Sequence, residues 1–359
     1  MADRAHEITE RIIKSTEERL RREYEQAAAE LEDKLNDHFR RYKIKDEKWR
    51  QWVKDGKRTE KEYQQWRKGQ LAVGERWGQM KDTIAEDLNH VNEIARDICA
   101  GQQVDIYAIN HAFGTYQIEH DAGINTSYTL YNHEAVENIL ANDPELLPPP
   151  GIRVSRAIAE GKATRWAKQK IQSTMLQGIL QGDSIPELAK RLATNVSDSN
   201  YKAAVRNART MATSAQNAGR YESYRRAKGM GIDLTIEWAA VLDNRTRHSH
   251  RQMHGQRREV DEPFTITDGG RTFNIMWPAD CNSSQSNAPQ KEIWCCRCTL
   301  LSWVKGFEHD MQTDSDKMTM SFDEWLQVEP GKEEFLPILS QYEKGQAIKM
   351  QYIREYKYG

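Results

Sequence analysis

The first 100 residues carry apolar side chains at intervals of three and four, the spacing of helices with one apolar face. Charged residues of both signs fill the positions between them, so the apolar stripe is narrow. The spacing also predicts a helix over residues 84–100, ended by Gly101, and a less regular section over residues 104–131. A narrow stripe covers one partner helix, which predicts an extended, mostly helical region over residues 1–143. The stripe consists of Ile8, Ile12, Leu20, Tyr24, Ala28, Leu31 and Leu35.

The helical pattern breaks at three consecutive prolines, Pro148–Pro150, which no helix can contain. Residues 144–151 are therefore predicted to form a stiff linker. Helical spacing returns over residues 152–231, in two stretches. The first covers residues 154–192 and includes a helix start at Ser184, whose hydroxyl can cap a helix with Glu187 three positions later. The second covers residues 200–229 and should end at Gly229 or Gly231.

A different pattern covers residues 232–305. Residues 234–238 alternate in the manner of a strand, and turn-forming glycines and prolines follow at short intervals. We expect a small β-rich module with long loops here and a C-terminal tail over residues 306–359, with a short helical segment near Trp325. The predicted fold class is α+β, with a helical N-terminal part, a helical middle and this module.

Composition limits the function classes. Charged residues make up 30% of the chain and the net charge is −2, which argues against a dedicated nucleic-acid-binding protein. Four of the five cysteines lie between residues 281 and 298, which indicates a metal site or burial rather than a secreted disulfide framework. The N-terminus lacks the apolar segment of a signal peptide, and no apolar run is long enough for a membrane span. We expect a cytoplasm-like environment and no membrane partner.

Aromatic and basic residues alternate between residues 43 and 77, where Trp49, Trp52, Tyr63, Trp66 and Trp77 lie. This spacing is typical of packing between helices, although such residues can also stack on single-stranded DNA. An arginine-rich face of the helix over residues 200–229 is expected to be solvated or ion-paired. Its members are Arg206, Arg209, Arg220, Arg225 and Arg226.

The order of motifs in the C-terminal half resembles the phage head-morphogenesis family, the Mu F-like minor head proteins. The resemblance covers roughly residues 150–305 and includes a helical Ala-Arg-Thr motif followed by Asn217. Cys295 departs from the pattern, because the family usually has Asn before Cys-Arg-Cys. The motif positions are Arg209, Thr210, Trp238, Asp243, Arg245, Thr246, Arg247, His250, Gly255, Pro263, Phe264, Cys296, Arg297 and Cys298.

This resemblance implies a non-enzymatic minor capsid protein that acts in head morphogenesis. Its implied partners are the portal protein and the major capsid or scaffolding proteins, and its implied location is the virion, after assembly in the host cytoplasm. Some relatives carry an ADP-ribosyltransferase extension after Cys-Arg-Cys, for which the tail here is too short. Two alternatives stay open: a zinc-dependent hydrolase or nuclease, and a DNA-binding protein delivered with the phage genome.

Zinc is the candidate cofactor, in a structural role. Cys296 and Cys298 are two positions apart, so on a strand both thiols would face one side, and His250 could add an imidazole nitrogen. The fourth ligand could be Cys281, His254 or His248. Without metal, the two cysteines would be small buried hydrophobic residues. Arg297, on the opposite side, is expected to pair with Asp243, which should hold its loop together.

Overall fold

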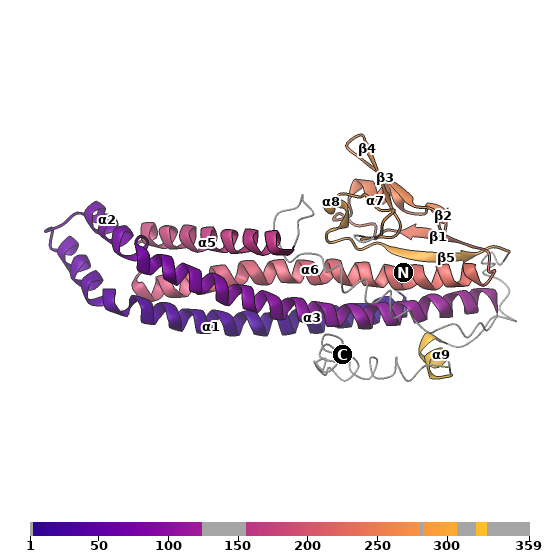
Figure 1. The fold of residues 1–359 in the computed structure, drawn as a ribbon, viewed down its shortest axis with the longest axis horizontal. Coiled ribbons are helices and arrows are strands. Elements are labelled where there is room, and N and C mark those ends of the chain that lie inside the picture. Colours follow the sequence, from indigo (N-terminus) through magenta and orange to yellow (C-terminus); the bar gives the residue numbers. More distant parts are fainter. Residues whose placement is uncertain (1–2, 124–155, 281–282, 307–320, 329–359) are drawn as a thin grey trace. The chain divides into compact units, whose positions relative to one another are not determined.

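The computed structural model describes residues 3–123, 156–280, 283–306 and 321–328, which form two compact units (Figure 1). The fold is α+β, as predicted. Each unit combines separate stretches of chain, whereas the sequence suggests consecutive domains. The predicted domain boundaries stay a prediction. The predicted linker over residues 144–151 lies outside the described residues. Unit 1 comprises Met1–Glu18, Asp97–Pro144 and Arg206–Gly359, and unit 2 comprises Arg19–Arg96 and Glu145–Val205.

Unit 2 is helical and draws on α1 (Arg4–Lys54), α2 (Glu60–Leu71), α3 (Glu75–Ala122), α5 (Arg156–Gln181) and α6 (Ile185–Gly229). The N-terminus of α2 is fixed by a capping box, in which Thr59 and Glu62 bond each other's backbone N–H. The predicted cap of α6 is also present, since Ser184 Oγ accepts from Glu187 N at 3.4 Å and Ser184 N donates to Glu187 Oε2 at 2.6 Å. The apolar stripe of α1 is buried as predicted, apart from the half-buried Ala28.

The aromatic residues of unit 2 pack against one another. Trp49 lies 5.5 Å from Trp66 between ring centroids, and Trp77, 2% exposed, stacks on Phe39 at 6.1 Å. These contacts confirm the packing interpretation for these rings. Leu180 of α5, however, does not pack in this core, because it is 70% exposed.

The prediction that a helix ends at Gly101 is wrong. Helix α3 continues through Gly101 to Ala122, so residues 104–122 are helical rather than irregular. Interior glycine costs a helix only about 0.5–1 kcal/mol, and burial of Ile106, Ile109 and Ile118 outweighs that cost. Helix α6 is likewise continuous, so residues 185–192 and 200–229 belong to one helix rather than to the two separate stretches predicted. It ends at Gly229 as predicted.

The second half of α3 and of α6 packs in unit 1 against the start of α1 and the short helix α9 (Phe322–Val328). Helix α9 falls in the tail segment for which a helix is predicted. Its Trp325 donates to the buried Glu119 at 2.8 Å, and its Asp323 accepts from Arg4 at 3.0 Å. Among the described helices, none has a stretch long and apolar enough to cross a membrane.

The β-rich module lies against α6 in unit 1 (Figure 1). Strand β1 (Leu234–Ala239), which confirms the strand predicted over residues 234–238, is central in the order β2-β1-β5, with β2 (Arg257–Glu259) and β5 (Thr299–Val304) antiparallel to it. A hairpin joins β3 (Phe264–Asp268) to β4 (Arg271–Ile275). Gly269 and Gly270 form its two-residue turn with φ of 56° and 76°, values suited to a type I′ turn. Two short helices, α7 (His248–Met253) and α8 (Gln290–Ile293), complete the module.

Candidate functional site

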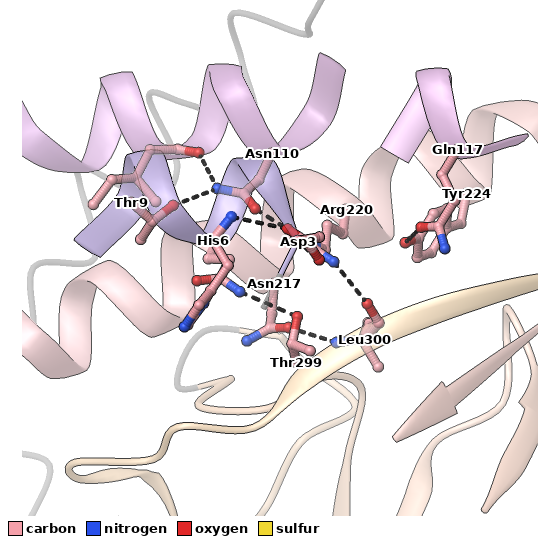
Figure 2. Close-up of polar contacts among 12 residues, drawn as sticks. Asp3, His6, Thr9, Asn110, Gln117, Asn217, Arg220, Tyr224, Thr299 and Leu300 are labelled. Carbon is pink, nitrogen blue, oxygen red and sulfur yellow. Dashed lines mark hydrogen bonds and ion pairs between the residues drawn. The ribbon is translucent and has the colours of Figure 1, made fainter. Parts of the chain in front are cut away.

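Helix α6 supplies the hydrogen bonds that an additional strand would give to the outer edge of β5. Asn217 donates through Nδ2 to Cys298 O at 3.0 Å and accepts through Oδ1 from Leu300 N at 2.9 Å. Arg220 donates to Leu300 O at 3.3 Å. An unpaired strand edge exposes backbone donors and acceptors, and these two side chains satisfy those of Leu300 (Figure 2).

The same helix holds the segment before β5. Thr210 accepts at Oγ1 from Cys295 N at 3.0 Å, and Thr213 donates to Cys296 O at 2.8 Å. The motif residue Thr210 thus fixes the backbone beside Cys-Arg-Cys. Arg209 points elsewhere and pairs with Glu17 at 2.5 Å.

Arg220 is a buried hub rather than part of a solvated basic face. Its side chain is fully buried and donates through Nη2 to both oxygens of Asp3 at 2.8 Å, and through Nε to Asn110 at 3.1 Å (Figure 2). Asn110 in turn donates to Thr9 at 2.9 Å. The hub therefore ties α1, α3, α6 and β5 of unit 1 together. A buried charge keeps such partners because leaving it unpaired is costly.

The ion pair predicted between Asp243 and Arg297 is present. Arg297 donates to Asp243 Oδ2 at 2.7 Å and to Oδ1 at 2.6 Å, in a two-pronged arrangement. These bonds from Arg297 hold the pKa of Asp243 well below its usual range, although partial burial opposes them. Asp243 also accepts from Arg245 N at 2.9 Å and from Thr246 Oγ1 at 3.1 Å, as a loop-organising residue does.

Other motif residues also serve the backbone. Arg247 donates to Trp294 O, which joins the Asp243 loop to the chain before Cys295. Gly255, with φ of 78°, donates its N–H to Trp238 O at 2.9 Å, and glycine adopts this backbone conformation without strain. The arginine Arg245 has an exposed side chain, whereas Trp238 is fully buried and lies edge-on to Phe264 at 5.4 Å.

His250, Cys296 and Cys298 meet in the interior of the module. His250 Nδ1 lies 3.4 Å from Cys298 Sγ and 3.6 Å from Cys296 Sγ, and all three residues are at most 3% exposed. His250 Nε2 faces Glu292 Oε2 at 3.2 Å, and Ser249 donates to that same oxygen at 2.7 Å. The structure therefore brings together the three residues predicted as ligands.

The two cysteines lie in the connection just before β5, not on the strand itself, and both thiols still face His250. Neither His248 nor His254 belongs to the cluster; both are exposed, and His254 Nδ1 accepts from Ala240 N at 3.2 Å. Cys281 lies outside the described residues.

The electrostatics of the cluster favour a protonated imidazole beside a thiolate when no metal is bound. Burial lowers the pKa of His250, but hydrogen bonding to Cys296 and Glu292 overcomes it and raises the pKa to about 9. A hydrogen bond with Cys298 is the main reason that the pKa of Cys296 lies well below its usual range. For Cys298 the pKa is raised, because Cys296 holds the charge and Cys298 donates to it.

Sequence reasoning missed Glu292, Ser249 and the role of Arg220. Glu292 is separated from His250 by several strands and carries no local motif. Arg220 resembles any other arginine of a basic helix face. A weak signal for Glu292 was its place on α8, shortly before Cys-Cys-Arg-Cys.

Comparison with known proteins places the module among phage proteins. Residues 169–301 match the family model described as Phage Mu protein F like protein. The Minor head protein GP7 of Bacillus phage SPP1 is 25% identical over 299 residues, which cover 82% of this chain and 84% of that protein. The NAD(+)--arginine ADP-ribosyltransferase EFV of Enterococcus faecalis (strain ATCC 700802 / V583) is 29% identical over 218 residues.

That second similarity covers 58% of this chain but only 40% of the Enterococcus protein. No solved structure matches the chain significantly. The match of residues 169–301 begins within α5, contains all of α6 and ends within β5, so it includes the motif positions described above. Through this region, the chain is similar to the family described as Phage Mu protein F like protein.

Proposed function

We propose that this chain is a minor head protein that acts in phage head morphogenesis without catalysing a reaction. The similarity to the minor head protein of phage SPP1 carries the proposal, because it extends over 82% of this chain and 84% of that protein. A relation of nearly full length on both sides includes the N-terminal helices, which the family model does not cover.

The geometry of the motif residues supports a structural role. Asp243 pairs with Arg297, and Arg247 bonds Trp294 O; both contacts hold loops within the module. Thr210 accepts from Cys295 N and Asn217 accepts from Leu300 N, and these two contacts hold the module on α6. None of these four side chains is held free toward a cleft in the way that a general acid, base or nucleophile requires.

The partners we propose are the portal protein and the major capsid or scaffolding proteins, and the proposed location is the virion, after assembly in the host cytoplasm. Long charged helices such as α1 offer surface for such contacts. The proposed role does not include the transferase activity named for the Enterococcus relative, of which this chain matches 40%. Purified chain incubated with NAD⁺ and an arginine-containing acceptor should transfer no ADP-ribose.

The decisive experiment is a stop codon early in the gene within the phage genome, with the intact gene supplied from a plasmid as control. We expect defective heads by electron microscopy without the plasmid and normal heads with it. Mass spectrometry of purified virions should detect the chain, and crosslinking should join it to the portal or the shell. Normal, infectious heads that lack the chain would refute the proposal.

A further inference from the structure

We propose that His250, Cys296 and Cys298 bind one zinc ion that staples the module, with Glu292 orienting the histidine. This inference stands on the geometry of the cluster and does not depend on the role in phage assembly. Among the described residues, these three form a group whose ligand atoms all lie within 4.8 Å of one another.

The separations match those of a tetrahedral metal site. Zinc binds thiolate sulfur at about 2.3 Å and imidazole nitrogen at about 2.0–2.1 Å. Two such ligands at a tetrahedral angle lie about 3.6 Å apart. His250 Nδ1 lies 3.4 Å from Cys298 Sγ and 3.6 Å from Cys296 Sγ, so one ion can reach both sulfurs and the nitrogen without a rearrangement of the chain.

The outer contacts prepare His250 to be a ligand through Nδ1. Glu292 Oε2 lies 3.2 Å from Nε2, and Ser249 holds that carboxylate oxygen at 2.7 Å. A carboxylate on one ring nitrogen places the proton there and directs the lone pair of the other nitrogen toward the metal. The arrangement is thus carboxylate, histidine, metal, with Nε2 facing Glu292.

The surroundings suit bound thiolates. Cys298 N approaches Cys296 Sγ at 3.5 Å, in the position of an N–H donor to a metal-bound sulfur. The ring of Trp238 lies edge-on to His250 with centroids 5.5 Å apart, so an aromatic wall closes one side. Soft sulfur ligands with one imidazole select zinc over magnesium or calcium, which prefer oxygen. Three protein ligands leave a fourth position to water.

Such an ion would join three segments: α7 through His250, the connection before β5 through the cysteines, and α8 through Glu292. A structural zinc ion contributes folding free energy directly. The module holds its loops mostly by hydrogen bonds around Asp243 and Arg247, so loss of the ion should loosen these segments together.

The test uses the full chain, purified without chelator, with metal content measured by plasma mass spectrometry. We expect about one zinc per chain. Cobalt(II) replacing zinc should give the thiolate-to-metal charge-transfer absorption and the intense visible bands of a tetrahedral site. Chelator should lower the melting temperature, and added zinc should restore it.

Variants separate the ligands from their neighbours. Cys298→Ser should abolish the cobalt charge-transfer band, whereas the matched control Cys295→Ser, at the adjacent exposed thiol, should retain metal. Glu292→Gln should keep the cobalt spectrum but weaken zinc binding by about 10- to 100-fold. Since Cys298→Ser could fail to fold, Glu292→Gln and the wild-type chelation experiment carry the test in that event. A folded wild-type chain that holds no zinc, is indifferent to chelator and gives no cobalt bands would overturn the proposal.

Discussion

Asn217 offers a direct test of how α6 holds the module. Replacing it with alanine removes the acceptor for Leu300 N and the donor to Cys298 O, both of which are buried with it. A buried backbone group that loses its partner costs about 1–3 kcal/mol, and two such groups are affected. The better helix propensity of alanine returns up to about 0.7 kcal/mol. We therefore expect the free energy of unfolding to fall by about 1–5 kcal/mol.

Urea denaturation measures this loss, and hydrogen exchange with mass spectrometry localises it to the peptide that contains β5. The matched control is Gln216→Ala, the neighbouring residue, whose amide donates only to the Thr299 hydroxyl at 3.1 Å. That control should cost about 1 kcal/mol. Asn217→Asp keeps the acceptor and should preserve protection of the Leu300 amide while it destabilises the contact with Cys298 O. Equal, small effects of Asn217→Ala and Gln216→Ala would refute the idea that α6 replaces a strand.

Three further predictions concern backbone strain, pH and helix contact. Cys295 has φ of 54°, a conformation that asparagine tolerates better, so Cys295→Asn should raise the unfolding free energy by about 1 kcal/mol in urea denaturation, while Cys295→Val should lower it. His111 is fully buried, and burial, reinforced by Arg226, lowers its pKa to about 3, so the folded state binds fewer protons than the unfolded state below pH 6.5. The stability that neutral His111 contributes is fully present above pH 6.5 and is lost as the pH falls, so the free energy of unfolding should be about 2 kcal/mol lower at pH 5. The free energy of unfolding of His111→Gln, measured against pH, should lack this decrease. A Cβ on Gly219 would lie 2.5 Å from Tyr107 O, so Gly219→Ala should lower the melting temperature, whereas Gly78→Ala on α3, with nothing within 4 Å, should leave it unchanged or raise it.

The sequence predicted what local periodicity and chain geometry determine. The helices, the cap at Ser184 and strand β1 follow from spacing, and the Asp243–Arg297 pair follows from alternation along an extended segment between two cysteines. Cys295 shows how far a motif can be understood afterwards: where the family pattern has asparagine, the backbone is left-handed.

The features of the fold and of the site that the sequence did not predict depend on contacts between residues far apart in the chain. The continuity of α3 through Gly101 follows from tertiary burial, which helix-stop rules cannot include. The carboxylate of Glu292 meets Ser249, 43 positions away, and Arg220 meets Asp3, 217 positions away. Neither pair leaves a periodic pattern in the sequence. The contacts of Glu292 and Ser249 beside His250, and those of Arg220, could therefore be found only from the structure.

The hub at Arg220 has a consequence for synthesis on the ribosome. Asp3 leaves the exit tunnel first, yet its arginine partner is made 217 residues later, and Arg4 meets Asp323 only after 319 residues. Contacts of such separation close large loops and form slowly. The nascent N-terminal segment must therefore wait, with its apolar face uncovered, until α6 and then α9 have emerged. Chaperones that shield nascent chains should consequently matter more for unit 1 than for unit 2, whose segments are all made by Val205.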